Sequence, residues 1–379
     1  MRSSSLRVLT IAHNAVAASN RARTEALRML PGVEVQLLTP PWWFEEGRRI
    51  EARPSPGWRV GRTVFAGNGT RHVYLTGLVD SIRECQPDII DLYEEPFSLV
   101  ALQTLLTREV LAPRAALVFY SAVNVEREWR WPYRGIERLV LRRADGAHAP
   151  NDDVPRILRA KGLAADRPIS VIPLGVDLKR FASAVPMELA GVPRPRIGFV
   201  GRFEPVKGLD VLMDAFRRVT TKASLVLAGD GAQRRMLSGE RVHVLPPLDF
   251  DNVPSFLKAL DVLVLPSVTI LPQHREQFGR VLVEAMAAGV PVVGSTSGAI
   301  PTVIGDAGLI VPERDAVGLA NAVDAVLSRP DLRQSLVERG LQRAHSRFAW
   351  STIAEQTLEL FRQAMAHRRD VPTLQAVGA

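Results

Sequence analysis

Short apolar runs alternate along the whole chain with longer segments in which apolar residues recur at helical spacing. A buried run bounded by turn residues is typical of a strand, and an amphipathic segment is typical of a helix that covers it. The pattern therefore predicts an α/β protein. The expected strands are residues 7–12, 33–38, 88–93, 115–120, 146–149, 170–177, 197–200, 225–228, 242–245, 261–266 and 290–294.

The remaining segments are less regular. Residues 58–65 and 72–74 alternate well enough for short strands, and residues 40–44, with two Pro and three aromatic residues, predict a loop. Helical periodicity marks residues 19–29, 78–85, 98–107, 134–143, 316–327, 330–347 and 351–367.

Two carboxylates, Glu276 and Glu284, stand eight positions apart around a Gly and an apolar run. The run predicts a helix that Gly289 and Pro291 end, with Glu276 in the loop before it and Glu284 inside it. A helix start offers free N–H groups that suit a phosphate. Eight helical residues span about 12 Å, enough to bracket a diphosphate. The alternative is a surface helix with two solvated Glu.

A second candidate anion site follows the strand at residues 197–200. Arg202 and Lys207 flank a turn that contains Pro205, close to a helix start. Arg can fork to two phosphate oxygens, and Lys supplies a point charge. Two surface cations beside a turn would be the alternative.

The turn after the first strand, residues 13–18, contains no Gly, so the G-x-G-x-x-G pattern of a dinucleotide site is missing. In a doubly wound sheet this turn still points into the crevice at the strand carboxyl ends, which makes His13 and Asn14 binding candidates. Glu94 and Glu95 follow another strand and are candidates for the same reason. Helix capping is the alternative for all four.

Composition sets broad limits. A length of 379 residues suggests two or three domains, and 46% apolar with 23% charged residues is ordinary for a soluble globular protein. Cys85 is the only cysteine, so we expect no disulfide framework and a reducing cytoplasm. The chain begins almost directly with a strand, and we expect neither a signal peptide nor a spanning helix.

The net charge is +8 and the pI about 10.2. Residues 127–143 hold six Arg and two Glu, with Trp129, Trp131 and Tyr133 between them. Such a stretch can lie on an anionic membrane, at the inner face in this case. The favoured interpretation is a loop and helix packed by its aromatic residues. No nucleic-acid motif accompanies the charge, so we expect no nucleic-acid partner.

Residues 276–293, with Phe278-Gly279, the run EAMAAGVPVV and the later segment 298–308, resemble the E-x7-E region of retaining family 4 glycosyltransferases, which have the GT-B fold. The resemblance implies that Glu276 contacts the donor sugar and Glu284 the nucleotide ribose. It also implies that Phe278, Gly279 and Arg280 offer backbone N–H groups.

The segment from Gly201 to Gly208 is similar to the family's G-R-x4-K-G segment, whose Arg and Lys hold the donor phosphates. The resemblance thus makes Arg202 and Lys207 catalytic candidates with Glu276. The turn at Gly229 and Asp230 either lines the nucleotide crevice or is a plain turn.

Two segments of the chain need separate comment: one lacks a residue that many family members carry, and the other resembles a metal-binding motif of a different fold. Many members carry a His just after the strand at 115–120, where this chain has Tyr-Ser-Ala-Val-Asn, so Ser121 and Asn124 become acceptor-side candidates and the acceptor class stays open. Asp249-Phe250-Asp251 resembles the metal-binding D-x-D of the other glycosyltransferase fold. It precedes a helix, so we interpret it as a cap and expect no metal.

The resulting expectation is a GT-B protein with two Rossmann-like domains facing across a cleft. Residues 1–190 would bind the acceptor, with residues 40–44 as a lip, and residues 191–350 would bind the donor. Residues 351–379 would form a helix that crosses back to the first domain, followed by a frayed tail from Asp370.

The expected activity is retaining, metal-independent transfer of a sugar from a nucleotide diphosphate-sugar to a hydroxyl, in polysaccharide or glycoconjugate biosynthesis. A UDP-sugar is the first expectation and a GDP-sugar the second, with no cofactor. The acceptor is a glycan, a lipid-linked molecule or a small molecule. The alternatives are a GT-B nucleotide-sugar epimerase and a non-catalytic scaffold at a membrane surface.

Overall fold

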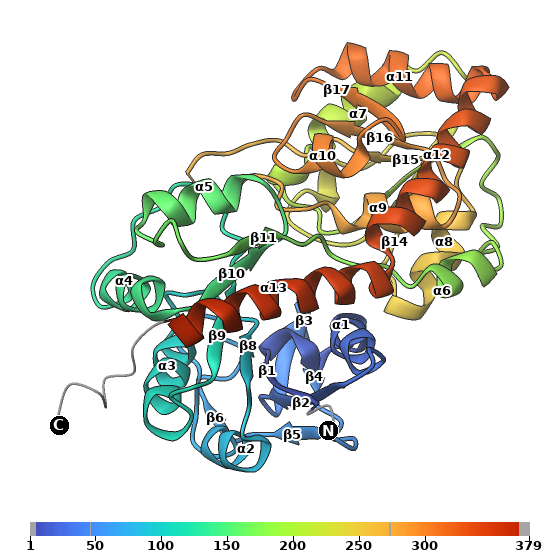
Figure 1. The fold of residues 1–379 in the computed structure, drawn as a ribbon. Coiled ribbons are helices and arrows are strands. Elements are labelled where there is room, and N and C mark those ends of the chain that lie inside the picture. Colours follow the sequence, from blue (N-terminus) through green and yellow to red (C-terminus); the bar gives the residue numbers. More distant parts are fainter. Residues whose placement is uncertain (1–4, 46, 273, 371–379) are drawn as a thin grey trace, which may run out of the picture. The chain divides into compact units, whose positions relative to one another are not determined.

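The computed structural model describes residues 5–45, 47–272 and 274–370 (Figure 1). The chain divides into two compact units. The first unit comprises Met1–Pro173 and Trp350–Ala379, and the second comprises Leu174–Ala349.

The first unit is built on a seven-stranded sheet whose neighbouring strands all run parallel, in the order β11-β10-β9-β8-β1-β2-β5. The central apolar runs are buried on both faces, as in β8, where all four residues are buried, whereas the edge strands β5 and β11 are only partly buried. Its strands are β1 (Leu6–Ile11), β2 (Val33–Thr39), β5 (Trp58–Val60), β8 (Ile89–Leu92), β9 (Ala116–Tyr120), β10 (Gly146–Ala149) and β11 (Ile169–Val171). Its helices are η1 (His13–Val16), α1 (Ala18–Arg28), α2 (Leu78–Cys85), α3 (Leu99–Leu111), α4 (Tyr133–Arg143), α5 (Asp153–Ala160) and α13 (Trp350–Asp370).

Two antiparallel hairpins are added to the first unit. The pair β6 (Thr63–Val64) and β7 (Val73–Tyr74) lies in the region expected to form short strands. The prediction of a loop at residues 40–44 is wrong, because β3 (Trp42–Glu45) pairs with β4 (Arg48–Glu51). The two prolines precede the strand instead of interrupting it, so its N–H groups stay available for pairing.

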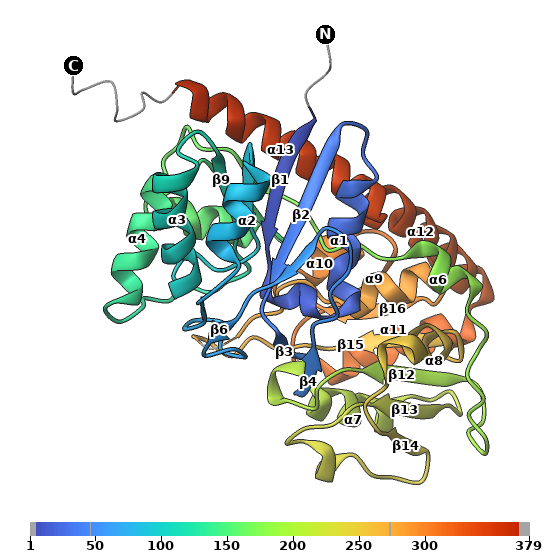
Figure 2. The same cartoon turned by 90° about the horizontal axis from the view of Figure 1, so that it is seen from below.

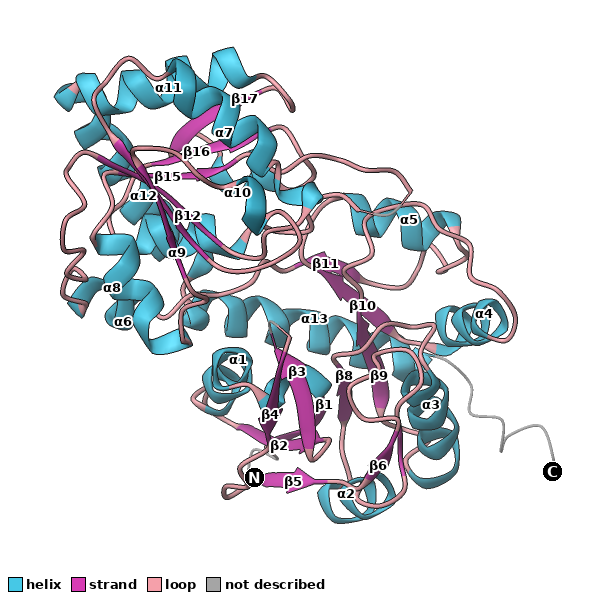
Figure 3. Ribbon diagram, turned by 180° about the vertical axis from the view of Figure 1, so that it is seen from behind, coloured by secondary structure: helices cyan, strands magenta, loops and turns pink. Residues whose placement is uncertain are grey.

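The second unit has a six-stranded sheet, also parallel throughout, in the order β14-β13-β12-β15-β16-β17 (Figure 3). Its strands are β12 (Arg196–Val200), β13 (Ser224–Ala228), β14 (Val242–Leu245), β15 (Val262–Leu265), β16 (Val292–Ser295) and β17 (Gly308–Val311). Its helices are α6 (Leu178–Ser183), η2 (Pro205–Lys207), α7 (Leu209–Arg218), η3 (Arg234–Met236), η4 (Phe250–Asn252), α8 (Val253–Lys258), α9 (Arg280–Ala287), α10 (Ile300–Ile304), α11 (Ala316–Ser328) and α12 (Pro330–Phe348).

The two units divide at Pro173, before the expected boundary at residue 190. The intervening residues pack into the second unit, because Val176, Phe181 and Leu189 belong to its hydrophobic core. Val176 N–H also donates to the Phe348 carbonyl at 2.8 Å.

Helix α13 belongs to the first unit (Figure 2). Its buried residues Ile353 and Phe361 pack in one cluster with Val8 of β1 and Ala116 of β9, and Arg368 Nε donates to the Pro113 carbonyl at 3.2 Å. The remainder of the expected tail, residues 371–379, lies outside the described residues. Among the helices in the described part of the chain, none combines the length and the apolar character that a membrane span requires.

A buried ion pair joins α1 to the first sheet. Asp91 of β8 is fully buried and accepts hydrogen bonds from both terminal nitrogens of Arg23, at 2.6 and 3.2 Å, and from Thr10 Oγ1 at 3.0 Å. Burial alone would raise the pKa of Asp91, but the Arg23 charge and its hydrogen bonds hold that pKa well below the usual range. Asp91 therefore stays ionised inside the core.

We expect Asp91→Asn to lower the free energy of unfolding by about 3–5 kcal/mol, because it leaves the buried Arg23 guanidinium without its counter-charge. The midpoint of urea unfolding at pH 7 measures the loss. Asp80→Asn is the control, since Asp80 has a half-exposed side chain 3.7 Å from Arg59 and should change stability by less than about 0.5 kcal/mol. Equal midpoints for the two variants would contradict the assignment.

Candidate functional site

In each sheet, two neighbouring strands mark the place where the order of strands along the chain reverses. In the second unit these are β12 and β15, because the chain passes from β12 out to β13 and β14 and then returns to β15 on the other side. The loops after such strands diverge from one another, and ligands of open α/β sheets bind at this edge. The loops after β12 and β15 carry most of the expected donor residues.

These two loops meet at Glu276. Lys207 Nζ lies 2.8 Å from Glu276 Oε2, and Ser267 Oγ donates to the same oxygen at 2.8 Å. Glu276 is only 6% exposed. Two of the three expected catalytic residues therefore contact each other directly, although 69 positions separate them.

The electrostatics keep Glu276 ionised. Burial would raise its pKa, but the Lys207 charge and the hydrogen bonds from Lys207 and Ser267 outweigh burial and lower it. A carboxylate in this state only accepts hydrogen bonds, so it can bind the hydroxyl groups of a sugar. Nearby, burial lowers the pKa of His274 and keeps its ring uncharged.

Arg202 lies in the same loop as Lys207 but is more open to solvent. Its side chain is half exposed and its Nη1 donates to Glu204 Oε1 at 2.9 Å. Its charge still acts on His274, as does that of Lys207, so both cations lie near the Glu276 loop.

Phe278, Gly279 and Arg280, which are expected to offer backbone N–H groups to the donor, lie at the start of α9. Gly279 is its N-cap residue at φ 78°, and Phe278 is buried with its ring 6.0 Å from that of Phe348. Because the Phe278 side chain belongs to the core, its predicted contact with a ligand would have to come from its backbone. Arg280 is the first helical residue.

Glu284 is half-buried on α9, and its charge acts on Arg180 of α6. The Arg180 guanidinium lies 3.3 Å from the centre of the Phe250 ring and 3.2 Å from Asp251 Oδ1. Asp251 of the Asp-Phe-Asp segment is therefore engaged with an arginine. The Asp249 side chain makes no capping hydrogen bond to η4, so the expected cap is not formed by that side chain.

Glycines shape the loops around the donor residues. At Gly298, φ is +54° and a Cβ would lie 2.0 Å from the carbonyl oxygen of Glu276; at Gly229, a Cβ would lie 2.0 Å from that of Gly201. A side chain at either position would therefore prevent the close approach of the neighbouring loop. Asp230 closes its own turn, because its Oδ1 accepts from the Gly231 N–H at 2.9 Å, which favours the plain-turn interpretation of its side chain.

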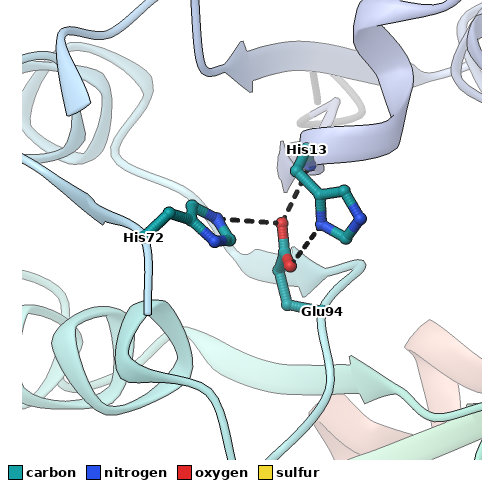
Figure 4. Close-up of side chains that lie close together, drawn as sticks. All are labelled: His13, His72 and Glu94. Atoms are coloured by element: carbon teal, nitrogen blue, oxygen red, sulfur yellow. Dashed lines mark hydrogen bonds and ion pairs between the residues drawn. The ribbon is translucent and has the colours of Figure 1, made fainter. Parts of the chain in front are cut away.

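In the first unit the order of strands reverses between β1 and β8. His13 follows β1 and Glu94 follows β8, and the structure brings them together (Figure 4). His13 N–H donates to Glu94 Oε1 at 2.8 Å, and His13 Nδ1 lies 2.5 Å from Glu94 Oε2. His72, which the sequence analysis did not select, places Nε2 3.5 Å from Glu94 Oε1.

Glu94 is the buried, ionised member of this cluster. Burial would raise the pKa of Glu94, but the two histidines lower it to about 2. The Glu94 charge raises the pKa of His72 in spite of that ring's complete burial. Within the described residues, these are the three His, Cys, Asp or Glu side chains close enough together to hold a metal ion.

The other acceptor-side candidates, Glu95, Ser121, Asn124 and Asn14, also belong to the first unit. Glu95 accepts from Ser121 Oγ at 2.7 Å and from the Ala122 N–H at 2.8 Å. Burial raises the pKa of Glu95 to about 7, against the opposing effect of these two hydrogen bonds. Asn124 is buried, and Asn14 lies in η1, where its carbonyl accepts from Asn20 Nδ2 at 3.0 Å.

In the basic stretch at residues 127–143, one aromatic residue packs as the favoured interpretation expects. Trp129 stacks on Phe97 with ring centres 3.9 Å apart, and Arg127 lies over the Trp129 ring at 4.5 Å. Trp131 is 88% exposed. Contact with a membrane stays a prediction.

Two family models match the chain. The model described as "Glycosyl transferases group 1" matches residues 194–329, and the model described as "Glycosyltransferase Family 4" matches residues 22–180. The D-inositol 3-phosphate glycosyltransferase of Xylanimonas cellulosilytica is 31% identical over 259 residues, which are 62% of this chain and 60% of that protein. The phosphatidyl-myo-inositol mannosyltransferase of Mycobacterium leprae is 36% identical over 203 residues, 50% of this chain and 52% of that protein. The match thus spans between half and two thirds of these relatives.

Solved structures share the fold. Sucrose-phosphate synthase from Thermosynechococcus elongatus matches with a TM-score of 0.69 at 22% identity, over 95% of this chain and 99% of that one. HepE of Anabaena, solved in complex with UDP and glucose, matches with a TM-score of 0.67 at 18% identity, over 93% of this chain and 98% of that one.

The fold is therefore GT-B, with two Rossmann-like domains, and the chain belongs to the family 4 glycosyltransferases. The predictions of family and fold class are confirmed. The roles of the individual site residues stay predictions.

We expect Gly298→Ala to displace the Glu276 loop, because the new Cβ meets a backbone oxygen at a positive φ. The melting temperature should fall, and it measures the effect. Gly289→Ala is the matched control: Gly289 has φ +73° in the same unit, but its Cβ would come no closer than 3.8 Å to a neighbour. If both variants lose the same stability, backbone strain alone explains the glycine and the close approach does not matter.

The raised pKa of Glu95 predicts a pH dependence. Between about pH 4.5 and 7 the unfolded chain loses this proton before the folded chain does, so stability falls as the pH rises through that window. Glu95→Gln removes this contribution. Between pH 4.5 and pH 8 its free energy of unfolding, measured with urea, should therefore fall less than that of the wild type. Glu128→Gln, with an 81% exposed side chain, serves as control. Parallel pH profiles for wild type and Glu95→Gln would disprove the shift.

Proposed function

We propose that this chain is a retaining glycosyltransferase that moves a sugar from a nucleotide diphosphate-sugar to a hydroxyl acceptor, in polysaccharide or glycoconjugate biosynthesis. A UDP-sugar is the first candidate donor and a GDP-sugar the second. The observation that carries the proposal is the buried Lys207–Glu276 pair at the strand-order reversal of the second unit, a short distance along the chain from the start of α9.

The chemistry assigns a task to each group. Negative charge grows on the diphosphate as the bond to the sugar breaks, and donors aimed at that charge lower the barrier. Lys207 and Arg202 are suited to this role, together with the free N–H groups at the start of α9. In this proposal these groups stabilise the leaving group without a metal ion.

Lys207 and Glu276 can act together. An ammonium group has three N–H donors, so Lys207 can keep its contact with Glu276 while it binds a phosphate oxygen. Glu276, held ionised by Lys207 and Ser267, would accept hydrogen bonds from sugar hydroxyls and orient the ring. The departing phosphate would take the acceptor proton on the same face of the sugar, which retains the anomeric configuration.

The comparisons support the choice of donor and acceptor classes. HepE binds UDP and glucose in its solved complex. Two relatives are named D-inositol 3-phosphate glycosyltransferase and phosphatidyl-myo-inositol mannosyltransferase, and both inositol compounds carry hydroxyl groups. A glycogen synthase of Mycobacterium tuberculosis, 32% identical over 250 residues, supports a polysaccharide setting.

The test measures thermal stability with UDP, GDP, ADP and their sugars. A ligand at one hundred times its dissociation constant stabilises by about 2.7 kcal/mol, so one nucleotide should raise the melting temperature of the wild type by several degrees. Glu284→Ala should lose this response, because Glu284 is the expected ribose ligand. Glu240→Ala, an exposed Glu in a turn of the same unit, should keep it. A chain that responds to none of these nucleotides does not have the proposed donor site.

A further inference from the structure

The buried ring of His72 has one nitrogen with a partner and one without. Its Nδ1 lies 3.1 Å from the Asn68 carbonyl oxygen, which only accepts hydrogen bonds, so Nδ1 carries a hydrogen. Its Nε2 is buried and makes no hydrogen bond of normal geometry in the described part of the chain. A buried polar atom of this kind is costly, so a partner for Nε2 is expected.

The separation between His72 and Glu94 indicates what that partner is. His72 Nε2 lies 3.5 Å from Glu94 Oε1. A proton shared between an imidazole and a carboxylate draws the two atoms to about 2.7–2.9 Å. A tetrahedral Zn²⁺, at about 2.0–2.1 Å from a His nitrogen and about 2.0–2.2 Å from a carboxylate oxygen, sets the two ligands about 3.4 Å apart. The observed separation therefore fits two ligands of one ion better than it fits a hydrogen bond.

His13 supplies the third ligand. One ligand atom from each of His13, His72 and Glu94 lies within 4.8 Å of the other two, and Figure 4 shows the carboxylate between the two rings. His13 Nδ1 contacts the second carboxylate oxygen, Oε2, at 2.5 Å. Two ligands of one ion stay about 3 Å or more apart, so the His13 ring has to move outward by roughly 1 Å when the ion binds. Its side chain is 25% exposed, whereas the other two are fully buried, so His13 is the ring that can move.

The groups around the three side chains hold them in place. A metal-binding histidine typically donates its second ring N–H to a carbonyl or carboxylate group, which fixes the ring and its tautomer. The Asn68 carbonyl does this for His72, and the His13 backbone N–H holds Glu94 Oε1 at 2.8 Å. The Trp43 ring lies 4.3 Å from the His13 ring and 4.9 Å from the His72 ring, centre to centre, and covers both with apolar surface.

We propose that His13, His72 and Glu94 bind a divalent cation of the zinc class. Two imidazole nitrogens and one carboxylate suit Zn²⁺ and related late first-row ions, whereas Mg²⁺ and Ca²⁺ prefer oxygen ligands. Three protein ligands leave a fourth position for water. The ion ties η1 and the loop before β7 to the end of β8, and so stabilises the first unit. The proposal concerns this unit alone and does not rest on the proposed function, in which the donor phosphates are stabilised without a metal.

The test uses the full-length chain, stripped of metal by a chelator and then given Zn²⁺, Co²⁺ or Mg²⁺ alone. One Zn²⁺ per chain should stay bound through gel filtration, as measured by elemental analysis. Zn²⁺ in large excess over its dissociation constant should raise the melting temperature by several degrees, because it binds the folded chain, and Mg²⁺ at the same concentration should not. Co²⁺ should give the visible absorption of a cation with nitrogen and oxygen ligands, a readout that needs no variant.

Two variants locate the bound ion. His13→Ala and Glu94→Gln each remove one ligand and should weaken Zn²⁺ binding by more than about tenfold, since the loss of a group that merely orients a ligand already costs about 10–100-fold. His345→Ala is the control, because His345 is exposed on α12 of the second unit and its loss should leave Zn²⁺ binding unchanged. The melting temperature of each metal-free variant shows whether it folds. If Glu94→Gln does not fold, His13→Ala, which alters the partly exposed ring, carries the test.

Several results would overturn the proposal. A wild type that retains neither Zn²⁺ nor Co²⁺ would show that a proton alone joins His72 to Glu94. Nitrogen-15 spectra with His72 protonated at both ring nitrogens in the presence of Zn²⁺ would lead to the same conclusion. Zn²⁺ retention that matches the wild type in both His13→Ala and Glu94→Gln would place the ion elsewhere on the chain.

The same measurements separate this proposal from the proposed function. The donor residues lie in the second unit, so stabilisation by nucleotide should be equal with and without Zn²⁺. A chain that binds Zn²⁺ but no nucleotide would lose the proposed function and keep the metal site. A chain that binds nucleotide but no Zn²⁺ would lose the metal site alone.

Discussion

The reversal of strand order within each parallel sheet determines where the chemistry of this protein can lie. All carboxyl ends of a parallel sheet point to one edge, and on either side of the reversal the crossovers leave in opposite directions. At β12 and β15 this brings Lys207 and Glu276 together, and at β1 and β8 it brings His13 and Glu94 together. The same topological constraint thus produces one polar cluster in each unit.

Both clusters depend on pairing charges that would be costly to bury alone. An isolated ion in a protein interior loses several kcal/mol of hydration, and it stays ionised only if counter-charges and hydrogen bonds offset that loss. Glu276 has Lys207 and Ser267, Asp91 has Arg23 and Thr10, and Glu94 has two histidines. In each case the pKa of the carboxyl group falls in spite of burial. These groups are consequently fixed in one protonation state and one orientation before any ligand arrives.

Sequence patterns predicted what depends on neighbours along the chain. The buried strands and the helix from Arg280 follow from local periodicity, and Gly279 and Gly289 mark the two ends of that helix. Ser267 and His72 could not be found this way, because their significance comes from side-chain contacts with Glu276 and Glu94 that form only when the loops fold. The segment at Trp42 was misjudged as a loop, since its pairing with β4 depends on a partner strand and not on the prolines before it. The choice of Lys207 and Glu276 came from the resemblance to a family, and their direct contact could not have been read from spacing.

The two clusters differ in the side chains that surround their buried carboxylate. In the second unit Lys207 and Arg202 place cations at the edge of the sheet, where an anionic diphosphate gains most. In the first unit the carboxylate of Glu94 lies between two histidine rings, of which His72 is fully buried and His13 is 25% exposed. The two strand-order reversals therefore hold chemically different polar clusters, and this difference is the physical basis of the proposed division between donor and acceptor.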